Sequence, residues 1–331
     1  MSKTRAALEL TDVPAIGLGC MNLSHAYASP PPRAEAERLL HRAFEIGVRH
    51  FDTAALYGFG RNEDLVGSAM VGKRDAIFLA SKCGMTGVDG KRVIDGRPES
   101  ILATCDESLR RLQTDVIDLY YLHRLDKSVP VEESMGAMQR LVEAGKVRYV
   151  GLSEVSAATL RRAYAVHPVA AVQSEYSLWS RNVEIGVLAA CAELGVVFVA
   201  FSPLGRGFLT DVDLDPSAFE ERDIRRGMPR FQAANFPKNA SLLPAFRKLA
   251  GAAGCSAAQL ALAWLLQRHP GMHAIPGTTN LDHLAENVAA LDHCVPDDVL
   301  GRVEDLISSA TVSGPRYNAT TQAEIDTEEF A

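Results

Sequence analysis

The stretch Arg49-His-Phe-Asp-Thr-Ala-Ala-Leu-Tyr-Gly58 begins as a strand and ends on a loop. Residues 48–51 are rich in strand formers, and Gly47 stands just before them as a helix stop. Asp52 is therefore predicted at the C-terminal end of this strand, and Tyr57 on the loop that follows it. A carboxylate and a phenol thus follow the same strand.

Two later strands end at chemically functional side chains in the same way. Residues 76–81 lead into Lys82, and residues 116–122 lead into His123. In a parallel barrel, catalytic groups gather at the C-terminal ends of the strands. The sequence therefore predicts that an acid, a phenol, an amine and an imidazole meet at one face of the fold.

Strand-like and helix-like segments alternate along the chain. Repeated strand–helix units with short connections imply parallel strands joined by right-handed crossovers. Eight such units predict an α/β protein with a (β/α)8 TIM barrel fold. The strands are predicted at 15–21, 48–52, 76–81, 116–122, 146–153, 169–174, 196–200 and 272–275. The helices are predicted at 33–46, 62–71, 98–112, 131–144, 156–166, 182–194, 241–253, 256–268, 280–290 and 297–308.

No internal linker interrupts this series, so we expect a single domain over residues 1–331. Its barrel core is predicted at 15–310, followed by a polar C-terminal tail at 311–331. Residues 1–15 are expected to form a short N-terminal arm or hairpin over one end of the barrel. Residues 205–240 form a long loop after the seventh strand, and loops of that length are commonly functional lids.

Composition and charge narrow the class of protein. The chain has 331 residues, of which 47% are hydrophobic, and it carries a net charge of -7. Scattered basic residues and an acidic balance argue against nucleic acid and anionic membranes as partners. The chain lacks a long apolar run, and its six cysteines are widely spaced without metal-ligand spacing. We therefore expect a cytoplasmic protein that acts on a small molecule and holds no metal.

The predicted constellation suits proton transfer to a carbonyl oxygen. A tyrosine has a pKa of about 10 in water, and a nearby ammonium would lower it by stabilising the phenolate. Lys82 is placed to do so for Tyr57, with Asp52 balancing the charge of Lys82 and His123 orienting the carbonyl. The side chains include no hydride donor, so a nicotinamide cofactor is implied.

Each of these residues has a structural explanation when it is taken alone. Asp52 is as typical of a turn or helix N-cap, Tyr57 of a loop anchor, and Lys82 of a solvated strand end. His123 alone is more typical of a structural histidine. Their joint placement at the ends of three successive strands favours the catalytic interpretation. Other nicotinamide sites are not supported, since the chain lacks both Gly-x-Gly-x-x-Gly after a strand and Tyr-x-x-x-Lys.

An ordered set of motifs resembles the aldo-keto reductase superfamily over nearly the whole chain. The matching segments are Phe51-Asp-Thr-Ala-x-x-Tyr57, Ser81-Lys82, Leu122-His123, Gly151-Leu-Ser153, Val172-Gln-Ser-Glu-Tyr176, Ser202-Pro-Leu-Gly205, Ile275-Pro-Gly-Thr278 and Glu286-Asn287. Residues 122–126 and 275–279 look most like the NADP-dependent branch that includes pyridoxal reductase-like and auxin-induced-type proteins. The resemblance implies an NAD(P)H-dependent oxidoreductase that reduces aldehydes and ketones to alcohols.

The resemblance also implies roles for individual residues. Tyr57 would be the general acid, supported by Lys82 and Asp52, with His123 orienting the carbonyl. Ser153, Glu154 and Gln173 would meet the nicotinamide carboxamide, and Phe201 would stack on its ring. The remaining cofactor positions would be Met21, Asp52, Ser202, Pro203, Leu204, Arg206, Gly277, Thr278, Thr279, His283, Glu286 and Asn287. The substrate would meet Met21, Tyr57, His123 and Trp179.

Departures from the family pattern leave the cofactor choice open. Glu154 stands where many members have Asn, and Gly277, Asn280 and His283 stand where many carry Lys or Arg. NADPH is the preferred expectation, with NADH use possible. Two other functions fit the same residues: an NAD(P)+-dependent alcohol or sugar dehydrogenase, and a redox-sensing nucleotide-binding regulatory subunit.

Overall fold

The computed structural model describes residues 13–27, 29–88, 90–268 and 271–330. Eight parallel strands form one sheet in the order β1-β2-β3-β6-β7-β8-β9-β10. Gly17 N donates to Ala274 O at 2.9 Å, and this contact joins the first strand region to the last. The barrel strands are β1 Leu18–Gly19, β2 His50–Asp52, β3 Phe78–Cys83, β6 Ile117–Leu122, β7 Val147–Ser153, β8 Ala171–Glu175, β9 Val197–Phe201 and β10 His273–Ile275.

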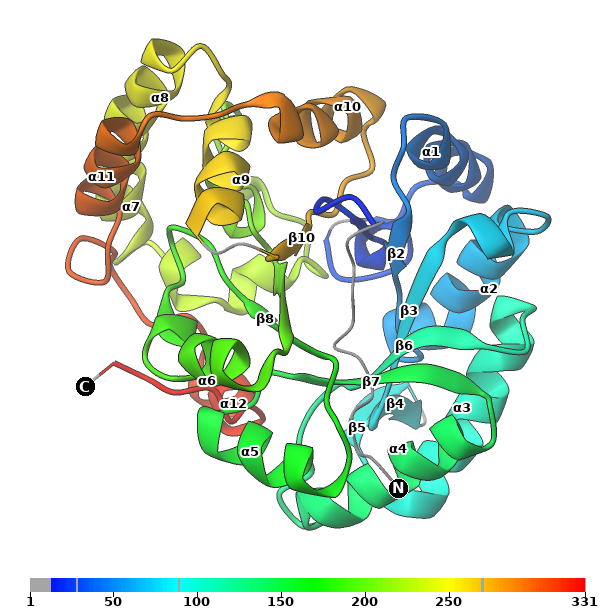
Figure 1. The fold of residues 1–331 in the computed structure, drawn as a ribbon. Helices are drawn as coiled ribbons and strands as arrows, with labels where there is room; N and C mark the ends of the chain where they lie inside the picture. Colours follow the sequence, from blue (N-terminus) through cyan, green and yellow to red (C-terminus); the bar gives the residue numbers. More distant parts are fainter. Residues whose placement is uncertain (1–12, 28, 89, 269–270, 331) are drawn as a thin grey trace.

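Helices surround this barrel, as Figure 1 shows. They are α1 Arg33–Glu45, α2 Arg61–Ala69, α3 Pro98–Leu112, α4 Val131–Glu143, α5 Ala157–Val166, α6 Val187–Leu194, α7 Phe236–Ala240, α8 Leu243–Ala252, α9 Ala257–Arg268, α10 Leu281–Ala289, α11 Asp297–Leu306 and α12 Ala319–Ala323. The predicted (β/α)8 barrel is confirmed. Each predicted strand and helix range contains a matching element, with boundaries that differ by a few residues.

The first strand, β1, is shorter than predicted, and its backbone is pressed against its neighbours. A Cβ on Gly17 would lie 2.8 Å from His50 O, and one on Gly19 would lie 2.7 Å from Ile275 O. Only glycine allows approach this close. The predicted N-terminal arm lies mostly outside the described residues.

Apolar side chains fill both faces of the barrel sheet. Strands of a parallel barrel are buried on two sides and therefore read as continuous apolar runs. The barrel interior holds small and branched residues such as Ala80, Leu119 and Val199. Between sheet and helices, the larger core includes Phe51 and Trp264, and α9 is buried along most of its length. This packing fixes the strand ends that carry the site.

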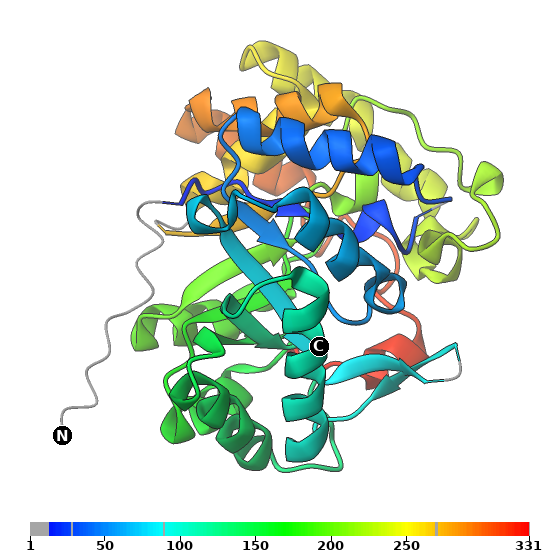
Figure 2. The ribbon, with the colours of Figure 1, turned by 90° about the vertical axis from the view of Figure 1, so that its right-hand side faces the viewer.

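Two features on the open face were not predicted. Strands β4 (Met85–Val88) and β5 (Lys91–Ile94) form an antiparallel hairpin after β3. The segment predicted as a polar tail instead packs on the barrel, with Arg316, Tyr317 and Ile325 buried. Figure 2 shows this hairpin beside α12 of the C-terminal segment, where Arg92 donates to Glu324. Hairpin and C-terminal segment therefore extend one side of the barrel mouth.

No single helix in the described part of the chain is long and apolar enough to cross a membrane. The segments Phe236–Ala252 and Ala257–Arg268 pass that test only as a pair, and they are bent by 77°.

Candidate functional site

A cavity of about 1000 Å³ opens at the C-terminal ends of the strands. Its walls come from residues far apart in the sequence, on the loops after β1, β2, β6, β9 and β10. Nearly all of the sequence-predicted site residues line it. These are Met21, Asp52, Tyr57, His123, Ser153, Gln173, Phe201, Ser202, Pro203, Leu204, Arg206, Gly277, Thr278, Thr279, His283, Glu286 and Asn287.

The four residues predicted to act together lie side by side at one end of this cavity. The ammonium of Lys82 donates to the Asp52 carboxylate and, at 2.8 Å, to Thr53 O. It also lies 4.9 Å from the ring centroid of Tyr57. The Tyr57 ring meets the His123 ring edge to face, with centroids 5.7 Å apart. Because β2, β3 and β6 are neighbours in the sheet, their ends bring these groups together.

Burial and charge set the protonation of this cluster. Burial acts to lower the pKa of Lys82, but the Asp52 carboxylate and Tyr57 outweigh it and raise that pKa above its ordinary value. Burial raises the pKa of Tyr57 although Lys82 opposes it, so the phenol keeps its proton at neutral pH. The sequence alone predicts a lowered pKa for Tyr57. The direction differs because desolvation of the phenolate exceeds the attraction of Lys82.

His123 is a neutral imidazole in this environment. Burial, followed by the charges of Arg124 and Lys82, holds its pKa well below the ordinary value. Its Nδ1 is buried and has no hydrogen-bond partner within the described residues. A neutral imidazole carries one N–H and can donate it to a bound oxygen atom. A protonated phenol and a neutral imidazole thus flank the same space.

Glu154, a predicted cofactor residue, does not line the cavity. It is fully buried, and its carboxylate accepts hydrogen bonds from Arg316 at 2.8 and 3.1 Å and from Thr327 at 3.0 Å. It also accepts one from the backbone N–H of Glu175. These four donors occupy both carboxylate oxygens. Glu154 is therefore an anchor for the C-terminal segment, whereas Ser153 and Gln173 line the cavity.

Trp179 also lies outside the cavity lining, contrary to its predicted contact with substrate. Its ring packs on Phe208, with centroids 3.8 Å apart, and against Phe231 at 5.3 Å. The indole thus belongs to an aromatic cluster beneath the long loop after β9. Its position under that loop depends on contacts that the local sequence does not reveal.

The opposite end of the cavity is built from the turn after β10 and the start of α10. Asn280 caps this helix by accepting from the N–H groups of Asp282 and His283, and its side chain is not part of the cavity lining. Asn287 Oδ1 is buried with no partner among the described residues, although Asn287 lines the cavity. A buried acceptor without a donor is costly. This end therefore suits a ligand that carries N–H groups, as an adenine does.

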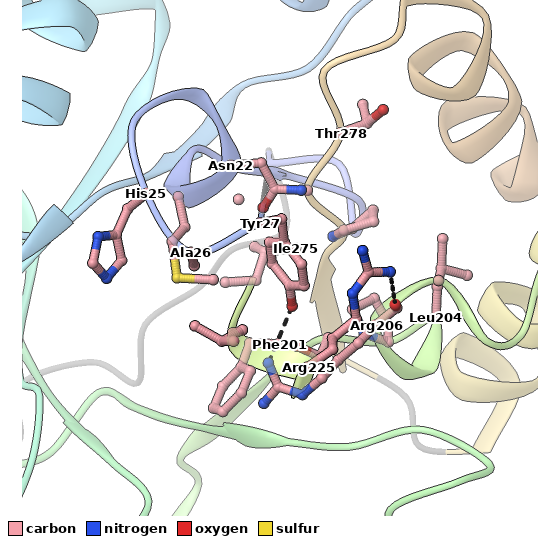
Figure 3. Close-up of a pocket in the computed structure, with 18 of the residues that line it drawn as sticks. Asn22, His25, Ala26, Tyr27, Phe201, Leu204, Arg206, Arg225, Ile275 and Thr278 are labelled. Carbon is pink, nitrogen blue, oxygen red and sulfur yellow. Dashed lines mark hydrogen bonds between the residues drawn. The ribbon is translucent and has the colours of Figure 1, made fainter. Parts of the chain in front are cut away.

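The loop after β9 crosses the cavity and contacts the loop after β1. Arg206 donates to the Tyr27 hydroxyl at 3.1 Å, a hydrogen bond drawn in Figure 3. The backbone N–H of Ile224 donates to Ala26 O at 2.9 Å, and Arg225 lies 5.3 Å from the Tyr27 ring centroid. The predicted long loop thus bridges the cavity as a strap, which we define as residues 205–225.

Several cavity residues escaped the sequence argument. Arg124 follows His123 directly and lines the same wall. Tyr317, Asn318 and Thr321 reach the cavity from the C-terminal segment. Arg124 could have been predicted from the sequence, because it directly follows His123, which was already predicted to lie in the site. No comparable pattern marks the C-terminal residues.

A barrel that gathers a carboxylate, a phenol, an ammonium and an imidazole at three neighbouring strand ends is suited to acid–base chemistry on a small bound molecule. The chain belongs to the aldo/keto reductase family, because the model of that family matches residues 15–308. Within the described residues, no group of His, Cys, Asp or Glu is arranged to hold a metal ion.

Individual relatives agree with this assignment. The chain is 43% identical to the NADP(+) aldo-keto reductase yakc of Schizosaccharomyces pombe over 312 residues, which is 92% of each protein. Its structure resembles the glycerol dehydrogenase of Gluconobacter oxydans with a TM-score of 0.83, 29% identity and 96% coverage of both chains. An aldo/keto reductase from Klebsiella pneumoniae, solved with NADP and acetate, has a TM-score of 0.70 and 28% identity, with 92% and 95% coverage.

Proposed function

We propose that this protein is an NADPH-dependent reductase that converts aldehydes and ketones to alcohols. The observation that carries the proposal is the buried Asp52–Lys82 pair beneath Tyr57 and His123 at the cavity wall. Family membership supports the reaction class, and the similarity to NADP-dependent relatives supports the cofactor.

Tyr57 acts as the general acid. Its pKa is raised by burial, so the hydroxyl is protonated at neutral pH and available to a carbonyl oxygen. The neutral His123 donates a second hydrogen bond to the same oxygen and fixes its position. As the Tyr57 proton leaves, the Lys82 ammonium stabilises the phenolate, and Asp52 keeps Lys82 charged and in place. A bound nicotinamide supplies the hydride.

The cavity residues fit a nicotinamide dinucleotide along its length. Ser153 and Gln173 would hold the carboxamide, although the side-chain amide of Gln173 already donates one hydrogen bond to Asp52 at 2.7 Å. Phe201 suits stacking on the nicotinamide ring, and the strap suits the pyrophosphate. The orphaned Oδ1 of Asn287 suits adenine, and Thr278, Thr279 and His283 suit the 2′-phosphate. These groups carry little fixed positive charge, so we also expect measurable NADH use.

The test is loss of absorbance of NADPH or NADH on addition of a panel of aldehydes and ketones. We expect turnover with several aldehydes and faster turnover with NADPH than with NADH. The Tyr57→Phe variant is the matched control, because it removes only the proton donor. Cofactor binding without turnover of any carbonyl compound would overturn the proposal and favour a regulatory role.

The same residues serve the reverse reaction, and one comparison favours that direction. The similar structure from Gluconobacter oxydans is a glycerol dehydrogenase. Oxidation of alcohols with NAD(P)+ is therefore the second candidate function. Initial rates measured in both directions at one pH, with the same alcohol and aldehyde pair, distinguish the two.

We propose a single domain and a place in the branch resembling pyridoxal reductase-like and auxin-induced-type proteins, on the motifs at 122–126 and 275–279. A cytoplasmic location is supported by six free cysteines, which are typical of a reducing compartment.

A further inference from the structure

Arg124 lies at the catalytic end of the cavity. It follows His123 at the end of β6, is partly buried, and lines the cavity wall. One of its terminal nitrogens, Nη1, donates to His123 O at 2.6 Å and to Ser153 Oγ at 3.3 Å. In the described part of the chain, its Nε and Nη2 make no hydrogen bond, and no carboxylate pairs with it. Part of the guanidinium therefore remains available as a donor.

The other arginines of the cavity wall differ from Arg124 in this respect. Arg206 pairs with Glu175, Arg225 with Asp223, and Arg92 with Glu324. Each of these charges is balanced by a carboxylate of the protein. Arg124 is thus the arginine of the cavity wall whose charge is not balanced within the described residues.

The nearby acids do not offset this charge. Asp52 is the carboxylate closest to the reacting groups, and Lys82 already pairs with it. The other cavity-lining acids are Asp282 and Glu286 on α10, at the opposite end, and Asp211 on the strap, which accepts from the backbone N–H of Ala257. The field of Arg124 reaches the reacting groups, because it is the first charge that lowers the pKa of His123 after burial. The catalytic end is therefore locally positive in a protein of net charge -7.

We propose that Arg124 binds an anionic group of the substrate, so that the preferred substrates are aldehydes or ketones that carry a carboxylate. A planar guanidinium can donate two parallel N–H groups to the two oxygens of a carboxylate. The adjacent His123 holds the carbonyl oxygen, so one wall of the cavity recognises both ends of such a molecule. This inference rests on the proposed carbonyl reduction and names its substrate class.

A role for Arg124 toward the cofactor is the competing explanation. Its neighbour Ser153 is placed for the nicotinamide carboxamide, which is neutral and requires no cation. The anionic part of a dinucleotide would be held by the strap, where Arg206 and Arg225 line the cavity. The free donors of Arg124 are therefore better matched to an anionic substrate than to the cofactor.

The kinetic test compares 4-carboxybenzaldehyde with its neutral amide, 4-carbamoylbenzaldehyde. We expect kcat/KM of the unmodified protein to favour the acid by roughly ten- to a hundredfold, the range of a hydrogen bond to a charged group. In Arg124→Gln this ratio should fall to about one, and Arg124→Lys should keep part of it. Arg148→Gln is the charge-matched control, since Arg148 is 58% exposed and is not part of the cavity lining.

A binding test provides a readout that does not depend on turnover. Calorimetric titration with 4-(hydroxymethyl)benzoate and 4-(hydroxymethyl)benzamide, in the presence of NADP+, should show tighter binding of the acid only where Arg124 is intact. Equal affinity for both compounds, or an Arg124→Gln variant that weakens NADPH as strongly as the acid, would overturn the inference.

The outcomes also separate this inference from the function on which it rests. Reduction of the amide and the acid at equal rates would overturn the role of Arg124 and leave carbonyl reduction intact. Failure of the unmodified protein to reduce either aldehyde, or any other in the panel, would overturn both. The comparison within the unmodified protein needs no variant, so misfolding of a mutant cannot hide the answer.

Discussion

Two buried ion pairs at the ends of the barrel strands invite comparison, Lys82 with Asp52 and Arg316 with Glu154. The side chains of both pairs are at most 2% exposed. Each begins with a carboxylate that follows or ends a strand. By burial, charge and position the two pairs are nearly alike.

They differ in what else the charged groups touch. Glu154 receives donors from Arg316, Thr327 and the Glu175 backbone, and it is absent from the cavity lining. Lys82 instead lies beside the Tyr57 phenol, which opens on the cavity. A buried ion pair is thus no indication of catalysis by itself. The indication is a reactive group next to the pair that the protein leaves accessible to a ligand.

Removing that reactive group should have the largest effect. Tyr57→Phe deletes the proton donor and leaves both ion pairs in place. We expect kcat for aldehyde reduction to fall by about 10²- to 10⁴-fold, the usual contribution of general acid catalysis. NADPH affinity, measured by quenching of protein fluorescence, should stay within about twofold. Near-normal turnover of this variant would refute the assigned chemistry.

Breaking either ion pair should cost similar stability. Lys82→Met and Arg316→Met each leave a buried carboxylate unpaired, which costs about 3–5 kcal/mol of unfolding free energy. Chemical denaturation followed by circular dichroism measures this loss.

Double variants sharpen the contrast between the pairs. Asp52→Asn/Lys82→Met and Glu154→Gln/Arg316→Met should each regain part of the lost stability, because no unpaired charge is left buried. Only the second double variant should reduce aldehydes. Comparable activity in both double variants would mean that the Asp52–Lys82 pair, like the Glu154–Arg316 pair, has only a structural role.

Buried titratable groups without a charged partner form a third case. His50 lies fully buried near the start of β2, where burial and then His273 lower its pKa to about 3, and burial lowers that of His273 to about 4. The folded protein therefore holds both rings neutral, while the unfolded chain takes up protons below a pH of about 6.5. Stability is complete above that pH and declines as the pH falls toward 4.

Replacing His50 tests this case. Between pH 7 and pH 5, His50→Leu should lose about 2 kcal/mol less unfolding free energy than the unmodified protein, since one buried histidine no longer needs protonation on unfolding. Urea titrations at the two pH values give the comparison. An equal loss in both proteins would show that folding does not lower the pKa of His50.

The smallest effect is expected at the exposed end of the cavity, where we propose that adenosine binds. Asn280 caps α10, so a lysine there would lose about 1 kcal/mol of capping. His283→Arg is the better test, because His283 lines the cavity and its cap contact uses only the backbone. A fixed charge should tighten NADPH by roughly 1.5- to 5-fold, as for an exposed ion pair, and leave NADH unchanged. Equal tightening of both cofactors would argue against a 2′-phosphate contact.

The sequence predicted the barrel and most of the cavity because those features are local. A carboxylate or imidazole at the end of an apolar strand can be recognised from a few consecutive residues, as at Asp52 and His123. The hairpin of β4 and β5 was missed although Asp89-Gly90 is a hairpin signal, because its strands are short and irregular in hydropathy.

The predictions for Glu154 and Trp179 differ from the structure because the positions of these side chains depend on contacts with distant parts of the chain. Glu154 was assigned to the cofactor because its partner, Arg316, stands 162 residues later. Trp179 was assigned to substrate although Phe208 and Phe231 cover it. The pKa of Tyr57 was predicted in the wrong direction because the extent of burial is not visible in a sequence. The extent to which a side chain is buried, and its contacts with distant residues, cannot be predicted from the local sequence.

The separation between Glu154 and Arg316 also has a consequence during synthesis. A ribosome delivers the chain from its N-terminus, so Glu154 emerges 162 residues before the arginine that neutralises it. Until then the carboxylate has to stay hydrated, because a buried unpaired charge is too costly. The rim at the ends of β7 and β8 therefore stays open in the nascent chain. The C-terminal segment that completes this rim can dock only after the strands that carry the reacting groups have been made.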